Sequence, residues 1–152
     1  MLSQLLQPKD ILLDVNVTGK DDLLQKIGRH MEWVQRLPQS VVVPALAHRE
    51  EIGSTALGHG VAIPHARIAS LDHTQLAYLR LAAPVDFGAP DGEPVGKVLV
   101  ILVPRMATDE HLQVLAEASE MFSDARFREQ LDRCRHPMET KQLFDNWPQP
   151  LF

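Results

Sequence analysis

The sequence predicts an α/β (α+β) fold, a three-layer α/β/α sandwich in which a central mixed β-sheet carries helices on both faces. Two observations lead to this prediction. Helical periodicity occurs toward both ends of the chain, whereas strand-like segments occupy its middle. One of these segments, Lys97–Val103, reads K-V-L-V-I-L-V, which is typical of a central strand buried on both faces. A strand of this kind needs a layer of helices on each side.

The N-terminal third predicts one strand followed by two helices. Residues 11–17 are typical of a short strand, and apolar residues recur at helical spacing over 20–36. The pair Leu37-Pro38 ends this helix, because proline pushes the residue before it out of helical geometry. A second helix, 40–51, begins at a serine that can cap it and ends at Gly53.

The rest of the chain predicts three strands and then three helices. The strand-like segments are 61–63, 75–82 and 97–103. The helices are expected at about 108–122, 124–135 and 138–146. Thr108 can cap the first of these helices, and Asp109 and Glu110 in its opening turn favour the positive end of the helix dipole.

Length and composition exclude several classes of protein. A chain of 152 residues fits one domain, 1–152. The net charge of -5 argues against general nucleic-acid binding, which needs a concentrated basic face. One cysteine, Cys134, excludes an internal disulfide framework. No signal peptide and no apolar run of about 20 residues is present, so we expect a cytoplasmic protein without membrane insertion.

The segment Arg49–Ile68, R-E-E-I-G-S-T-A-L-G-H-G-V-A-I-P-H-A-R-I, holds the densest group of candidate functional residues. His65 follows a short apolar strand and Pro64, and we expect the strand to stop at the proline. Site residues usually lie at such strand ends in layered α/β folds. A neutral imidazole has one nucleophilic nitrogen, so His65 could accept a phosphoryl group and return it.

The surrounding residues can hold a small anion. Arg49 offers a planar, always charged guanidinium for phosphate oxygens. Ser54 and Thr55 offer hydroxyl donors, and Gly58 and Gly60 allow backbone N–H groups to approach a phosphate. The Gly-Lys-Ser/Thr ending of a nucleotide P-loop is missing.

Each of these features also has a structural explanation. His65 could be a hydrogen-bonded residue without a catalytic role, the glycine-rich stretch a mobile loop, and 49–51 a solvated helix end. The residues alone leave both explanations open. A zinc site made of His59, His65 and His111 matches no ordinary ligand spacing, so we expect no metal and no cofactor.

The pattern R-E-x-x-G-S-T-x-x-G-x-G-V-A-I-P-H resembles the active-site signature of the type-2 IIA domains of the bacterial phosphotransferase system. These are the fructose- and mannitol-type enzyme IIA proteins and their nitrogen-branch relatives. The segments P-V-D-F-G-A-P-D-G-E-P-V and D-E-H-L-Q-V-L-A extend the resemblance over nearly the whole chain. It implies a single IIA domain in which a histidine phosphocarrier protein phosphorylates His65.

The resemblance also implies that Arg49 is the active-site arginine and His111 the second active-site histidine. The residues themselves allow this role for His111, because it lies in the first turn of a predicted helix, where unpaired N–H groups favour an anion. His111 could then donate a hydrogen bond to phosphate on His65. The alternative is that His111 simply caps its helix.

Ala56 and His59 are non-conservative departures from the family pattern. Family members commonly have Gly-Ile-Gly-Asn-Gly where this chain has Ala56-Leu57-Gly58-His59-Gly60. Alanine tolerates fewer backbone conformations than glycine, so the loop could be shifted or stiffer. We expect His59 to be solvated, with contact to phosphate or to a partner as the alternatives. The remaining histidines are expected on exposed helix faces or in loops.

Three functions remain possible. A free-standing IIA domain resembles the nitrogen-branch regulator, which controls targets such as potassium-transport proteins and sensor kinases. The alternative is a sugar-specific IIA component that passes phosphate to a IIB cysteine, and a further alternative is a binding module that transfers nothing. We expect Leu57, Ile68 and Leu71 either to form an apolar contact rim around His65 or to belong to the core.

Overall fold

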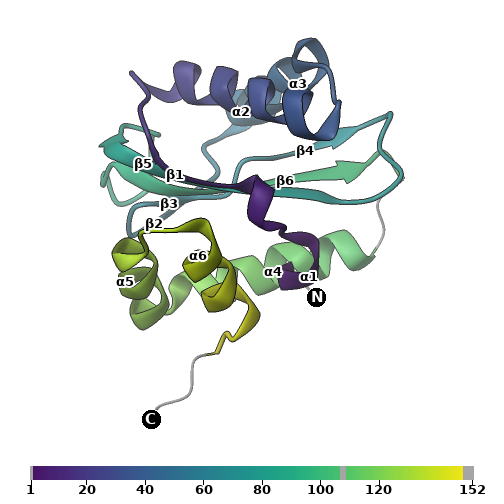
Figure 1. Ribbon diagram of the computed structural model, residues 1–152. Coiled ribbons are helices and arrows are strands. Elements are labelled where there is room, and N and C mark those ends of the chain that lie inside the picture. The colour runs from purple at the N-terminus through teal and green to yellow at the C-terminus, as the bar shows by residue number, and fades with distance from the viewer. Residues whose placement is uncertain (1, 107–108, 149–152) are drawn as a thin grey trace.

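A six-stranded mixed sheet forms the middle layer of the protein in a computed structural model that describes residues 2–106 and 109–148 (Figure 1). One face of the sheet is covered by two helices, α2 (Lys20–Gln35) and α3 (Gln39–Ile52). The other face is covered by α1 (Leu2–Leu5), α4 (Asp109–Ser123), α5 (Ala125–Arg133) and α6 (Pro137–Asp145). The predicted three-layer α/β/α sandwich is confirmed, whereas the single domain over 1–152 stays a prediction.

The sheet is built around its most completely buried strand. Its members are β1 (Ile11–Val15), β2 (Ala56–Gly58), β3 (Val61–Ala62), β4 (His65–Ile68), β5 (Gln75–Val85) and β6 (Val95–Pro104). They lie in the order β1-β5-β6-β3-β2, and β4 also pairs with β6. β6 is antiparallel to β5 and parallel to β3 and β4. The buried central strand expected from K-V-L-V-I-L-V is therefore confirmed.

Alternate residues of β6 face the two helical layers. Val98, Val100 and Leu102 belong to the core under α2 and α3, whereas Leu99, Ile101 and Val103 belong to the core on the other face. Successive side chains of any strand point to opposite faces. In β4, Ile68 is 1% exposed and lies in the α2–α3 core, so His65 and Arg67 belong to the opposite face, on which α4 lies.

Several element boundaries differ from the prediction. The helix α3 begins at Gln39 with Pro38 in the N-cap position, so the expected cap at Ser40 is wrong. Arg36 ends α2 in the left-handed conformation, with a φ of 59°. The expected cap at Thr108 falls outside the described residues. The strands β2 and β4 were not predicted, because segments of 3 and 4 residues show too little periodicity.

The close approach of α2 and α3 depends on Gly28. A Cβ at this position would lie 2.3 Å from Cγ2 of Val43. Gly28→Ala adds about 1 kcal/mol of helix propensity, but forcing the stiff valine aside costs about 1–3 kcal/mol. We expect a net loss of about 1 kcal/mol in the free energy of unfolding, measured by urea denaturation.

Gly53→Ala is the matched control, because a Cβ added at Gly53 would meet nothing within 4 Å and the φ of 164° at this residue is extended. We expect this control to change stability by less than about 0.5 kcal/mol. A Gly28→Ala protein as stable as the parent would show that the helices can separate at no cost.

Candidate functional site

His65 is the first residue of β4. The sequence had suggested that it follows the end of a strand, and this prediction is wrong. Pro64 cannot donate a hydrogen bond, but its carbonyl oxygen accepts from the N–H of Ile101 at 3.0 Å. Pairing with β6 therefore continues through the proline, and His65 lies opposite Ile101 in the parallel ladder. The histidine is held by the sheet itself, which fixes its backbone more firmly than a loop would.

One ring nitrogen of His65 is committed to the backbone. Nδ1 lies 2.8 Å from the carbonyl oxygen of Ile63. A carbonyl oxygen can only accept, so Nδ1 carries the hydrogen and the neutral ring keeps its lone pair on Nε2. This contact orients the imidazole and leaves Nε2 as its nucleophilic atom.

His111 lies close to His65, in the first turn of α4. The two ring centroids are 6.3 Å apart. Nδ1 of His111 is buried and has no hydrogen-bond partner within the part of the chain that the structure describes. Burial lowers the pKa of His111 below its usual value, and the charges of His65 and Arg67 lower it further. At neutral pH this imidazole is therefore uncharged and has one N–H to donate.

Arg49 lies in the last turn of α3 and contributes to both pockets that His65 lines. Its Nη1 donates to the carbonyl oxygen of Gly53 at 2.8 Å. We call one pocket the Arg67 pocket; its volume is about 420 Å³, and it also contains Arg67 and His111. We call the other the Ser54 pocket, of about 340 Å³, which adds residues 54–57 and part of α4. The three residues expected at the site therefore lie together.

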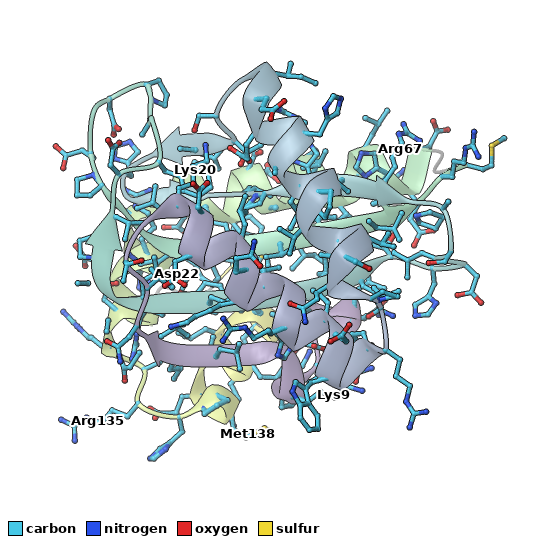
Figure 2. The ribbon with its side chains drawn as sticks, turned by 90° about the horizontal axis from the view of Figure 1, so that it is seen from above. Lys9, Lys20, Asp22, Arg67, Arg135 and Met138 are labelled. Atoms are coloured by element: carbon cyan, nitrogen blue, oxygen red, sulfur yellow. The ribbon has the colours of Figure 1, made fainter. Side chains whose placement is uncertain are left out.

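Arg67 is a site residue that the sequence interpretation missed. It lies two positions after His65 in β4, which places it on the same face of that strand. Its Nη1 donates to the carbonyl oxygen of Arg105 at 2.9 Å. Figure 2 shows Arg67 at the edge of the molecule, and the Arg67 pocket thus has two guanidinium groups, a charge arrangement that favours an anion. The pattern H-A-R would have indicated it if the strand had been continued past Pro64.

The hydroxyls of Ser54 and Thr55 bond to other groups of the protein, so their expected role toward a phosphate stays a prediction. The hydroxyl of Ser54 donates to the carbonyl oxygen of Phe87 at 2.7 Å, and that of Thr55 donates to the Glu50 carboxylate. A hydroxyl has one hydrogen to donate, so neither has one left for a phosphate in this structure. Both side chains line the Ser54 pocket and hold its loop in place.

Gly58 and Gly60 also lie in a different place from the one expected. Gly58 is the last residue of β2 and Gly60 lies in the turn that leads to β3, and their φ angles are 99° and 77°. The carbonyl oxygen of Gly60 accepts from the N–H of Lys97, whereas His65 pairs with Ile101, four positions further along β6. Four residues of strand span about 13 Å. Neither glycine lines a pocket with His65, so an anion-binding role for these two positions stays a prediction that this geometry does not favour.

The two departures from the family pattern are accommodated locally. Ala56 lies in β2, where it pairs with Ala62, and its φ angle is not positive. Alanine therefore needs no glycine-like conformation here. His59 is exposed at the turn, as expected, with a φ of 56°, and its backbone N–H donates to Asp91 at 2.9 Å. Of the remaining histidines, His30 was expected on an exposed helix face, but only 8% of its side chain is exposed. Its ring binds the carboxylate of Asp10.

Exposed apolar side chains lie around the two pockets. We call Ile52, Leu57 and Leu112 the apolar rim; they are 75%, 43% and 63% exposed. Leu57 was expected here, and it lines the Ser54 pocket. For Ile68 the other expectation holds, because it is 1% exposed and belongs to the core, and Leu71 packs against that core. The rim is thus made of two helix residues and Leu57.

Metal-binding clusters and membrane-spanning helices are both absent from residues 2–106 and 109–148. No group of three or more His, Cys, Asp or Glu side chains in these ranges is placed to hold a metal ion. None of the helices described is both long and apolar enough to cross a bilayer.

The titration of His111 gives a test of this geometry. We expect its pKa to lie below the value of about 6.5 for an exposed histidine, and to rise when phosphate is attached to His65, because an anion favours the imidazolium. The pKa of His111 is lower in the folded protein than in the unfolded chain. Between these two values the unfolded chain binds more protons, so the stability contributed by His111 falls as the pH drops below about 6.5. Two-dimensional NMR of the ring nitrogens measures both changes, and a pKa that phosphorylation leaves unmoved would contradict the proximity.

Comparison with known proteins agrees with this arrangement. Residues 4–147 match the family described as phosphoenolpyruvate-dependent sugar phosphotransferase system, EIIA 2. The chain is 38% identical over 133 residues to the nitrogen regulatory protein of Pseudomonas aeruginosa, covering 86% of this chain and 85% of that protein.

Solved structures show the same fold. The nitrogen regulatory protein IIA-Ntr of Neisseria meningitidis is similar with a TM-score of 0.89 and 38% identity, covering 93% of this chain and 97% of that one. The mannitol IIA in a complex with phosphorylated IIB from Escherichia coli has a TM-score of 0.77 at 20% identity, covering 93% of this chain and 99% of that one. At this identity the likeness supports only the fold. The chain belongs to the EIIA 2 family of the phosphoenolpyruvate-dependent sugar phosphotransferase system.

Proposed function

We propose that this protein is a phosphohistidine carrier in which Nε2 of His65 accepts phosphate from a histidine phosphocarrier protein. The observation that carries the proposal is the bond from Nδ1 of His65 to the Ile63 carbonyl oxygen. It leaves Nε2 as the free nucleophile of a ring that lines the Arg67 pocket with Arg49 and His111. Phosphoryl transfer chiefly needs such positioning together with neutralisation of charge.

The transfer exchanges one P–N bond for another. The lone pair on Nε2 of His65 attacks phosphorus while the P–N bond to the carrier's imidazole breaks. The hydrogen on Nδ1 stays on that nitrogen and remains hydrogen-bonded to the Ile63 carbonyl oxygen. When the donor imidazole also carries a hydrogen on its second nitrogen, no net proton transfer is needed. The guanidinium groups of Arg49 and Arg67 stabilise the charge on the phosphoryl oxygens, and neutral His111 donates an N–H to one of them.

The apolar rim is suited to transient complexes with partner proteins. Ile52, Leu57 and Leu112 expose apolar surface around a half-buried histidine. Transient signalling complexes bury small interfaces, so a few such side chains are sufficient. We assign the rim to the phosphocarrier protein and to the protein that next receives or senses the phosphate, both in the cytoplasm.

The destination we propose is regulation of the nitrogen-branch type. The relatives at 38% identity are named nitrogen regulatory proteins, which favours this branch. Potassium-transport proteins and sensor kinases are the targets to test, through the dependence of their binding on the phosphorylation of His65. A sugar-specific IIA would instead pass its phosphate to a IIB cysteine, and rapid transfer to a cognate IIB would decide for that alternative.

The test is phosphorylation by a reconstituted carrier system. Wild-type protein incubated with phosphoenolpyruvate, enzyme I and the phosphocarrier protein should gain one acid-labile phosphate, and His65→Ala should gain none. His59→Asn is the matched control, because it removes an exposed imidazole and asparagine tolerates the left-handed backbone at this turn. Wild-type protein that stays unlabelled with its cognate partners would refute the proposal and favour a binding module that transfers nothing.

A further inference from the structure

We propose that Glu50 is a positioning residue for phosphotransfer, acting through the loop that orients Arg49, with Lys20 as its counter-ion. The inference rests on the proposed function of His65. Glu50 lines neither of the pockets that contain His65, so its role would be to position other groups rather than to contact the phosphate. Its carboxylate instead binds Thr55 in the loop between α3 and β2.

The carboxylate of Glu50 is buried and fully bonded. The residue is 9% exposed, and its Oε1 lies 2.9 Å from Nζ of Lys20. The same oxygen accepts from the backbone N–H of Thr55 at 3.1 Å, and Oε2 accepts from the Thr55 hydroxyl. A buried charge persists only when it is paired and hydrogen-bonded in this way, and each lost partner leaves it unsatisfied.

These bonds fix the loop that holds Arg49. Glu50 fastens Thr55, while the hydroxyl of Ser54 donates to Phe87. The same loop presents the carbonyl oxygen of Gly53 that accepts from Nη1 of Arg49 at 2.8 Å. A shift of residues 53–55 would therefore move the acceptor that aims the guanidinium.

Lys20 contacts both Glu50 and Phe87. Its Nζ lies 4.3 Å from the centroid of the Phe87 ring, in addition to its ion pair with Glu50. Lys20 and Arg67 lie on opposite sides of α3 in Figure 2, so the ammonium is placed away from the Arg67 pocket. Lys20 thus neutralises the Glu50 carboxylate, which would otherwise repel an incoming phosphate, without adding a third cation to that pocket.

Glu50→Gln keeps the shape of the side chain and removes its charge. We expect the maximal rate of phosphate acceptance to fall about tenfold or more, since small misplacements of a positioning group cost up to about 10²-fold. KM for the phosphocarrier protein should stay unchanged, because Glu50 is buried and offers no surface to the partner. Thr55→Val, which removes the hydroxyl donor, should reduce the rate as well, and Thr55→Ser should restore it.

A double-mutant cycle with Arg49→Met separates positioning from general destabilisation. If Glu50 acts through Arg49, Glu50→Gln should cost much less in the Arg49→Met background than in the wild type. Asp10→Asn is the matched control, because Asp10 is another buried carboxylate (2% exposed) and bonds His30 and Gln35, neither of which lines a His65 pocket. It should lower the melting temperature without changing the rate per folded molecule.

The outcomes are distinguishable. A Glu50→Gln rate within twofold of a wild type that is itself labelled would overturn this inference and leave the proposed function standing. Equal fold losses in the two Arg49 backgrounds would also overturn it, because they would show that Glu50 acts independently of the arginine. A wild type that accepts no phosphate would refute the proposed function itself.

Discussion

Arg49→Met should slow phosphate acceptance by His65 about 10²-fold or more, the loss typical of removing one preorganised donor from a developing charge. The guanidinium lines both pockets that contain His65 and is aimed by the Gly53 carbonyl oxygen. Arg49→Lys should recover only part of the rate, because an ammonium cannot make two parallel bonds to a phosphate. Rapid-quench measurement with labelled phosphocarrier protein gives both rates.

The matched control for Arg49 is Arg135→Met. Arg135 is exposed and lies far from Arg67 in Figure 2, near the other end of the molecule. Its loss changes the net charge by the same amount and should leave the rate unchanged. A folded Arg49→Met protein that accepts phosphate as fast as the Arg135→Met protein would show that Arg49 has no part in the transfer.

Phe127→Ala should be the most destabilising substitution among those considered, with a loss of about 3–5 kcal/mol in the free energy of unfolding. Phe127 is fully buried beneath the sheet, and its ring centroid lies 5.2 Å from that of Phe144 and 5.6 Å from that of Phe122. The deletion leaves a cavity inside this aromatic cluster. The melting temperature of a domain of this size should fall by about 10 °C.

Calorimetry and urea denaturation measure the loss at Phe127, and Met138→Ala is the control. Met138 is 53% exposed, so its truncation should change stability by less than about 0.5 kcal/mol. Since Phe127 lines neither His65 pocket, the folded variant should accept phosphate at the parent rate below its melting temperature. A loss smaller than about 1 kcal/mol would mean that the cluster repacks without a cavity.

The sequence was most informative where a pattern was long. The apolar run of 97–103 predicted the buried centre of the sheet, and helical periodicity predicted α2, because burial imposes such patterns over many residues. His65, Arg49 and His111 could be grouped from the sequence, although only the resemblance to a family linked His111 to the other two. The geometry places all three at one end of the sheet.

Where the structure differs from the sequence interpretation, one reason is that a short stretch of sequence does not show its long-range partners. Ser54 and Thr55 looked like free hydroxyl donors, but Phe87 lies 33 residues away in sequence and takes one of them. Gly58 looked like part of an anion cradle, yet its positive φ serves a turn beside Asp91. Arg67 was missed because Pro64 was taken as the end of a strand that in fact resumes at His65.

The ring nitrogen that carries the phosphate is the most direct test of a carrier built on His65. Nδ1 of His65 is occupied by the Ile63 carbonyl oxygen, so long-range ¹H–¹⁵N correlation spectra of the protein phosphorylated by its carrier should place phosphate on Nε2 of His65. The NMR signals of the His111 ring should shift, because the ring centroids of His65 and His111 are 6.3 Å apart, but His111 should gain no phosphate. Phosphate on Nδ1 of His65, or on His111 or His59, would contradict the proposed mechanism.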